Sequence, residues 1–173
     1  MRFFLSIVSL LCLFAAPAAF AAPQPDLQLS PDCTLCGMDR AKFNFSRMVI
    51  EYEDGSSIGV CSLHCAAVEL ANTIDKVPVM VRVADYDSKE LIDAYKAVWV
   101  IGGNTKGVMT VQAKWAFADK GAAERFVKAN GGKIATFDEA IKAAYDDMYQ
   151  DTKRIREYRK MKHMKHHGGE AKH

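Results

Sequence analysis

Two strands and a helix are predicted from residues 47–74, which read RMVIEYEDGSSIGVCSLHCAAVELANTI. In the first half of this stretch, apolar and polar residues alternate on either side of Asp54-Gly55, a pair typical of hairpin turns. We therefore expect strands at 47–53 and 57–60. In the second half the apolar residues recur at helical spacing, which predicts a helix directly after the hairpin.

The same order of elements recurs further along the chain. A third alternating strand at 79–83 completes a strand–strand–helix–strand unit. The second unit is predicted to contain a strand at 97–101, short apolar runs at 108–111 and 114–117 that flank a hairpin, a helix at 120–129 and a closing strand at 134–137. The repetition predicts an α+β fold of two similar halves packed together, at about 32–87 and 94–137.

Size and composition fit one globular domain with additional segments at its ends. The chain has 173 residues, of which 50% are hydrophobic and 25% charged, and a domain of this size folds without needing a disulfide or a metal ion. A capping box formed by Thr136 and Glu139 predicts the start of a last helix. The expected segments are a signal peptide at 1–21, an extended lead-in at 22–31, the α+β domain at 32–137, a C-terminal helix at 138–160 and a His- and Met-rich tail at 161–173.

The N-terminal segment has the features of a cleavable secretory signal. A short positive start precedes an apolar run, and Ala19-Phe20-Ala21 matches a small-x-small cleavage site. Pro17 ends the apolar run short of the ~20 residues that a spanning helix needs. The leucines before Cys12 are too large for a lipoprotein cleavage site. We expect an exported, periplasmic protein without a lipid anchor or stable membrane insertion.

Charge is distributed unevenly between the body and the C-terminal end. From Lys153 onward the chain carries eight basic and two acidic residues, whereas residues 22–152 carry a net charge of −5. An acidic body in an exported protein argues against nucleic-acid binding. The basic end is expected to meet an acidic partner, a membrane surface or a metal ion, unless it is simply a solvated, frayed helix end.

Four cysteines remain after removal of the signal, in the pairs Cys33/Cys36 and Cys61/Cys65. In an oxidising compartment two disulfides are one interpretation, with three possible pairings, and the protein would then be a stapled scaffold. A structural zinc site of four thiolates is another. Covalent haem attachment is excluded because no histidine follows either second cysteine.

The Cys33-x-x-Cys36 pair admits two functional interpretations. One is a thiol-disulfide oxidoreductase or redox sensor, although such a pair is expected at a helix start after a core strand rather than in a loop. The preferred one is a Cu(I) site, because thiolate and thioether sulfur select Cu(I). Cys33, Cys36 and Met38 offer three sulfur atoms within six residues, and Gly37 allows the backbone to fold around an ion.

The Cys33-x-x-Cys36-Gly37-Met38 motif, followed by an aliphatic strand and a hairpin turn, resembles the NosL family of nitrous-oxide reductase accessory proteins. The resemblance covers about residues 32–140. Its other parts are the strand at 98–102, Lys106-Gly107-Val108-Met109, Trp115-Ala116-Phe117 and Gly131-Gly132.

This resemblance implies a periplasmic metallochaperone that binds Cu(I) and is not an enzyme. It implies that the ligands are a cysteine of the Cys33/Cys36 motif and the methionine matching Met109, with Met38 nearby. The implied partners are a copper donor or a cuproprotein client, nitrous oxide reductase in the first place. The residues agree with a non-enzymatic role, because the sequence contains no recognisable nucleophile–base pair, phosphate loop or carboxylate dyad.

Two further groups of metal-ligating residues fall outside the resemblance. Cys61 and Cys65 lie one turn apart at a predicted helix start, with His64 beside them. The functional interpretations are a second metal site, a redox pair or a disulfide that staples the fold. The alternative is that they are small, half-buried residues without a function. In the tail, His163, His166 and His167 would share one side of a continuing helix and could capture copper.

Overall fold

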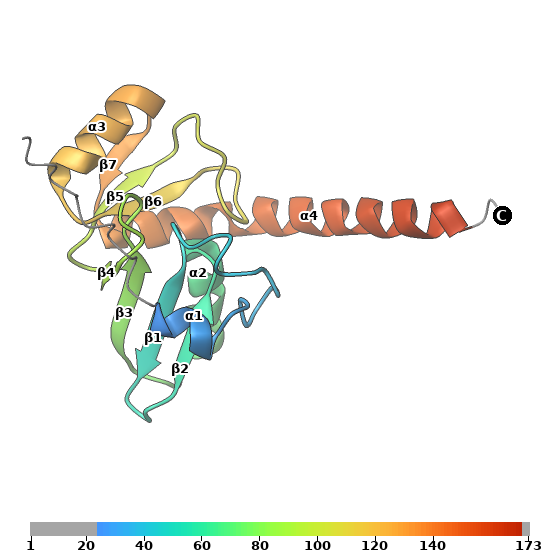
Figure 1. Cartoon of the computed structure of the whole chain (residues 1–173), viewed down its shortest axis with the longest axis horizontal. Coiled ribbons are helices and arrows are strands. Elements are labelled where there is room, and N and C mark those ends of the chain that lie inside the picture. The colour runs from blue at the N-terminus through green and yellow to red at the C-terminus, as the bar shows by residue number, and fades with distance from the viewer. Residues whose placement is uncertain (1–23, 171–173) are drawn as a thin grey trace, which may run out of the picture.

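The computed structural model describes residues 24–170, with side chains as far as Met164. The predicted signal peptide at 1–21 lies outside the described residues. Two antiparallel sheets and their helices form the body, and a long C-terminal helix projects from it (Figure 1). This mixed architecture confirms the predicted α+β class. Within the described residues, no helix is long and apolar enough to cross a membrane.

The first half of the body is a four-stranded sheet with one helix. Its elements are β1 (Met48–Tyr52), β2 (Ser57–Val60), α2 (Leu63–Asn72), β3 (Pro78–Ala84) and β4 (Leu91–Asp93), with strand order β2-β1-β3-β4. Met48 pairs with Val60 on one side and Val83 on the other, and all three are buried. The alternation in the sequence therefore predicted the buried face correctly. The edge strand β4 was not predicted, because three residues are too few to show a period.

The second half repeats this arrangement with three strands. Its elements are β5 (Val98–Ile101), β6 (Lys114–Phe117), α3 (Lys120–Asn130) and β7 (Lys133–Ala135), with strand order β6-β5-β7. This order is the counterpart of β2-β1-β3, and in each half a helix connects the second strand to the third. The prediction of two similar strand–strand–helix–strand halves is confirmed.

The apolar run at 108–111 does not become a strand beside a hairpin. It forms a bent segment between β5 and β6 in which Val108 is buried and Met109 has a φ of +62°. A Cβ on Gly107 would lie 2.7 Å from the Thr110 carbonyl oxygen, so the chain turns back tightly on itself here. The apolar character of the run reflects packing of this bend and not strand pairing.

Backbone bonds and aromatic rings join the two halves. Asp85, directly after β3, accepts a hydrogen bond from the Ala118 amide beyond β6 (2.8 Å), and the Tyr86 amide donates to the Ala116 carbonyl (2.8 Å). The Tyr86 ring packs against Trp115 and Phe126, with ring centroids 5.3 and 5.1 Å away. These contacts hold the end of β3 against β6 and α3 of the second half.

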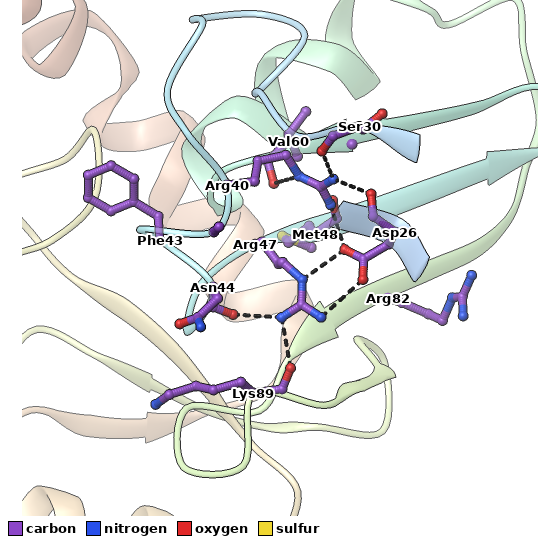
Figure 2. A network of polar contacts seen from close by, with 12 residues as sticks. Asp26, Ser30, Arg40, Phe43, Asn44, Arg47, Met48, Val60, Arg82 and Lys89 are labelled. Carbon is purple, nitrogen blue, oxygen red and sulfur yellow. Dashed lines mark hydrogen bonds and ion pairs between the residues drawn. The ribbon is translucent and has the colours of Figure 1, made fainter. Parts of the chain in front are cut away.

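The lead-in at 22–31 was predicted to be extended, and this prediction is wrong for Pro25–Leu29, which forms the short helix α1. Pro25 suits a first helical position, since its fixed φ matches the helix. Asp26 then receives hydrogen bonds from two buried guanidinium groups, those of Arg40 (2.9 Å) and Arg47 (2.7 Å) (Figure 2). The pairing of this one carboxylate with two buried guanidinium groups fixes α1 to the sheet, and no local pattern predicts it.

The last helix, α4, spans Phe137–Glu170 and passes the predicted end at residue 160. The predicted capping box is present: the Thr136 amide donates to Glu139 (2.8 Å), and the Glu139 amide donates to the Thr136 hydroxyl (3.3 Å). The helix continues because residues 153–164 contain neither glycine nor proline and are mostly strong helix formers. It passes α2 and then leaves the body (Figure 1).

Candidate metal centre

Four cysteine Sγ atoms from two distant segments converge, each within 4.8 Å of the others. Cys61 Sγ lies 3.6 Å from Cys36 Sγ and 3.7 Å from Cys65 Sγ, and Cys33 completes the group. All four are free thiols. Metal–sulfur bonds of ~2.3 Å place the sulfur atoms around a tetrahedral ion ~3.8 Å apart. The four-cysteine cluster therefore has the dimensions of a metal site.

The first two thiols lie on a tight loop that is held against β2. The Cys33 amide donates to the Met38 carbonyl (2.8 Å), and the Gly37 amide donates to the Cys33 carbonyl (2.8 Å). Gly37 has a φ of +71°, a conformation that glycine adopts without strain. Thr34 donates from its amide to the Gly59 carbonyl of β2 (3.2 Å). This loop leaves Cys33 buried and Cys36 half-buried.

Arg40 anchors the end of the same loop. Its amide donates to the Pro31 carbonyl (2.8 Å), and its side chain donates to the Val60 carbonyl (3.3 Å) at the end of β2. Burial by itself would raise the pKa of Asp26, but the hydrogen bonds and positive charges of Arg47 and Arg40 lower it by more. The pKa is therefore lowered, and the carboxylate remains charged. The ion pairs of Figure 2 thus position the cysteine loop beside the residue that follows β2.

The second two thiols lie where β2 passes into α2. Cys61 follows the strand directly and precedes the helix, whereas Cys65 lies in the first turn of the helix, and the two Sγ atoms are 3.7 Å apart. Both are buried, and Ser46 donates from its hydroxyl to the Cys61 carbonyl (2.8 Å). Since strand and helix are both core elements, this half of the cluster is more rigid and less accessible than the Cys36 side.

The thiols share their protons unequally. Hydrogen bonds from Cys36, Cys61 and Cys65 lower the pKa of Cys33 far below that of a free thiol. The hydrogen bond with Cys33 in turn raises the pKa values of Cys61 and Cys65, and burial adds to the effect. The metal-free cluster is thus expected to carry a thiolate at Cys33, and binding a metal ion would displace the remaining protons.

Met109 is the sulfur residue of the second half that reaches this region. It lines a cavity of about 190 Å³ together with Cys36, His64 and Cys65. Its φ of +62° is a left-handed conformation that costs a residue with a side chain about 1–2 kcal/mol. Backbone strain of this kind is typical of functional positions. The bend between β5 and β6 therefore brings a thioether to the edge of the four-cysteine cluster.

A residue of α4 fixes this bend. The Val111 amide donates to Asp151 Oδ1 (3.0 Å), and Asp151 Oδ2 faces His64 Nδ1 at 3.6 Å. Both side chains are buried, and those two facing atoms have no hydrogen-bond partner among the described residues. Burial lowers the pKa of His64 despite the nearby carboxylate, so the imidazole is neutral at pH 7. His64 lies beside the cluster without belonging to its inner group.

The remaining predicted ligands lie at different distances from the cluster. Met38 is half-buried and packs against the hydrophobic core, and its carbonyl holds the Cys33 loop. His163, on α4, lines an outer cavity of about 360 Å³ with Cys36, Arg159 and Lys162. The backbones of His166 and His167 continue the same helix, but their side chains lie outside the described part.

The fold and the four-cysteine cluster define an α+β protein with a sulfur-lined site suited to a soft metal ion. The chain belongs to the NosL family, whose family model matches residues 24–145. A solved structure described as the copper chaperone NosL from Shewanella denitrificans has the same fold, with a TM-score of 0.51 and 24% sequence identity; the match covers 74% of this chain and 96% of that one. A search of curated protein sequences found no match.

Sequence reasoning recognised all four cysteines but not the residues that bring them together. Asp26 and Arg40 set the position of the first loop, and Asp151 sets that of the Met109 bend. Each acts through a contact between segments far apart in the chain. The two arginines Arg40 and Arg47, shortly before an apolar strand, were the available signal, because a buried cation requires a counter-charge.

Proposed function

We propose that this protein is a copper chaperone, which carries Cu(I) on Cys33, Cys36, Cys61 and Cys65 with Met109 as an additional ligand. The single observation that carries the proposal is the convergence of four sulfur atoms within 4.8 Å of one another. Family membership supports it, as does the structural similarity to a protein described as a copper chaperone. Copper is the cargo, and the protein performs no chemical conversion.

The chemistry of the donors supports Cu(I) over other ions. The inner donors are all thiols, and the neighbouring donor is a thioether, a combination that favours Cu(I) over harder ions. Zinc in a structural role would occupy a closed site. Here Cys36 is half-buried and shares a cavity with Met109, so one side of the site stays open for ligand exchange.

The two sides of the cluster support a simple order of events. An arriving ion meets Cys36 and Met109 first, because they are the half-buried sulfur residues that line the cavity, and then exchanges onto the buried Cys33, Cys61 and Cys65. Release reverses this order when a partner offers competing sulfur or imidazole ligands. Delivery to a periplasmic cuproprotein, nitrous oxide reductase in particular, is the role that membership in this family supports.

A thiol-disulfide oxidoreductase is the second candidate. The Cys36–Cys61 contact of 3.6 Å and the lowered pKa of Cys33 favour it. However, Cys33 is only 1% exposed, so the thiolate cannot reach a substrate disulfide without opening of the loop. A carrier needs no such exposure, because a small ion enters through the cavity.

Titration of the reduced protein with Cu(I) against a competing chelator tests the proposal. The wild type is expected to hold copper in the presence of the chelator. Cys33→Ser/Cys36→Ser and Cys61→Ser/Cys65→Ser are each expected to lose it, because the two pairs form one cluster. Disulfide reductase turnover with only weak copper binding would instead establish the oxidoreductase. Retention of full affinity by the Cys61→Ser/Cys65→Ser variant would show that the ion does not use the joint cluster.

A further inference from the structure

The exposed part of α4 from Lys153 to Met164, here called the basic segment, carries charge of a single sign. It contains six Lys or Arg residues and one acidic residue, Glu157. All six basic side chains are exposed. Arg154 contacts Asp151 at 3.5 Å, and none of the other five forms an ion pair with the described residues. The segment thus presents a concentrated positive charge on a chain whose body, residues 22–152, has a net charge of −5.

The basic segment begins at the opening of the copper site. Arg156 and Arg159 line the cavity that contains Cys36, Cys65 and Met109. Arg159 also donates a hydrogen bond to the Cys36 carbonyl (3.3 Å). From this point α4 continues away from the body (Figure 1), so a molecule lying along the helix would reach the cavity opening at its near end.

A basic rim is an unexpected surrounding for a cation site if copper enters and leaves as a free ion. Positive side chains repel an approaching cation, and they attract carboxylates over a Debye length of about 8 Å at physiological salt. The rim therefore favours exchange of copper with a partner that is itself negatively charged. Such steering changes association rates by roughly 10 to 1,000-fold.

The distribution of charges around the helix favours a protein partner over a lipid surface. At 100° per residue, the charged residues Arg154 and Glu157 lie on the same side as the exposed Tyr158 and Met161, and the other basic side chains are spread around the rest of the helix. The basic segment therefore lacks the broad apolar face that an interfacial membrane helix buries.

We propose that the basic segment is the docking surface for an acidic protein, the one that exchanges copper with the four-cysteine cluster. This inference rests on the proposed function. Carboxylates of the partner would pair with the exposed Lys and Arg side chains, and its copper ligands would then lie beside Cys36. The acidic body would repel the same partner elsewhere, so docking is confined to the end that bears the site.

A binding experiment with a defined acidic probe tests the surface without copper. Fluorescein-labelled dodecaglutamate is titrated with the full chain at low and high salt, and binding is followed by fluorescence anisotropy. Lys153→Glu/Lys160→Glu/Lys162→Glu is expected to weaken binding at least tenfold at low salt. Lys120→Glu/Arg125→Glu/Lys128→Glu makes the same change in net charge on α3, whose three basic side chains are also exposed, and is expected to bind as the wild type does.

Copper transfer provides the second readout. Copper-loaded protein is mixed with bathocuproine disulfonate, a dianion, or with neocuproine, its uncharged analogue. Transfer to the dianion is expected to be about tenfold slower from the α4 variant than from the α3 variant, with no such difference for the neutral chelator. Because the peptide assay needs no copper, failure of the proposed function and failure of the docking surface are distinguishable.

Three results would overturn the docking proposal. One is equal loss of peptide binding in the α3 and α4 variants, which would indicate a response to net charge alone. Another is transfer of copper to the dianion at the same rate from the α4 variant as from the α3 variant. The third is tight binding to phosphatidylglycerol vesicles without binding to the peptide, which would assign the basic segment to a membrane surface. Circular dichroism of the α4 variant, and of its glutamine counterpart, checks that the helix is retained.

Discussion

Replacement of Asp26 by asparagine isolates the contact that joins α1 to the cysteine loop. The carboxylate is 12% exposed and receives hydrogen bonds from Arg40 and Arg47, which are 0% and 1% exposed. Removing one member of a buried ion pair costs about 3–5 kcal/mol. Asparagine keeps one acceptor oxygen but removes the charge from both pairs, so we expect a loss of about 3 kcal/mol in the free energy of unfolding at pH 7.

The pH dependence of this loss gives a further check on its cause. The pKa of Asp26 is lowered in the folded protein, so the carboxylate contributes stability at pH values above its unfolded pKa of about 3.9. That contribution is lost as the pH falls through the lower, folded pKa. The difference between wild type and Asp26→Asn is therefore expected to be complete at pH 7 and to shrink progressively below pH 4.

Urea unfolding followed by tryptophan fluorescence measures this difference, since Trp99 and Trp115 are both buried. A loss of about 3 kcal/mol corresponds to a lowering of the melting temperature by roughly 6–12 °C for a protein of this size. Asp75→Asn, which removes an exposed carboxylate, is the matched control and is expected to change stability by less than about 0.5 kcal/mol. A loss below about 1 kcal/mol at pH 7, or one independent of pH, would refute the assigned role of Asp26.

Three other predictions concern the site and its support. Met109→Leu is expected to weaken Cu(I) binding about tenfold or more in the chelator competition. Met38→Leu is expected to have a smaller effect, because of these two methionines only Met109 lines the cavity beside the cluster. Equal effects of the two substitutions would contradict this prediction. Gly59→Ala would place a Cβ 2.5 Å from a guanidinium nitrogen of the buried Arg40. The free energy of unfolding, measured in urea, is expected to fall by about 1–3 kcal/mol. The control Gly121→Ala, at a helical position, is expected to cause no loss. Hydrogen bonds from the other thiols lower the pKa of Cys33, so the reduced, metal-free protein is expected to keep its thiolate absorbance near 240 nm at pH 6. Cys33→Ser is expected to lose this absorbance. An unchanged spectrum of the variant would place the thiolate on another cysteine.

The repeated fold places the four-cysteine cluster at one end of its first half and brings in the second half as a cover. Cys61 and Cys65 sit at the connection between β2 and α2, and the second half supplies Met109 from the longer connection between β5 and β6. The equivalent helix start in the second half, at Lys120, carries no cysteine. The two similar halves have therefore taken different roles around one site.

Local patterns were sufficient for most of the elements. The alternation around Asp54-Gly55 predicted β1 and β2, and Gly55 has the positive φ of +79° that such a turn requires. The Thr136–Glu139 box predicted the start of α4. These features could be predicted from the sequence because each depends on residues close together in the chain. The resemblance to the NosL family, carried by the cysteine motif and Met109, likewise needed only the order of residues.

The convergence of the two cysteine pairs needed the tertiary structure. Cys36 and Cys61 are 25 residues apart, and three pairings of the thiols were equally compatible with the sequence. Their meeting depends on the pairing of Asp26 in α1 with two buried arginines, and α4 brings Met109 beside them by holding its bend through Asp151. The sequence by itself determined the strands, the helices and the soft character of the donors, because those follow from neighbouring residues. Only the packed structure decided which donors form one site, since that choice is made by buried charges whose partners lie in remote segments.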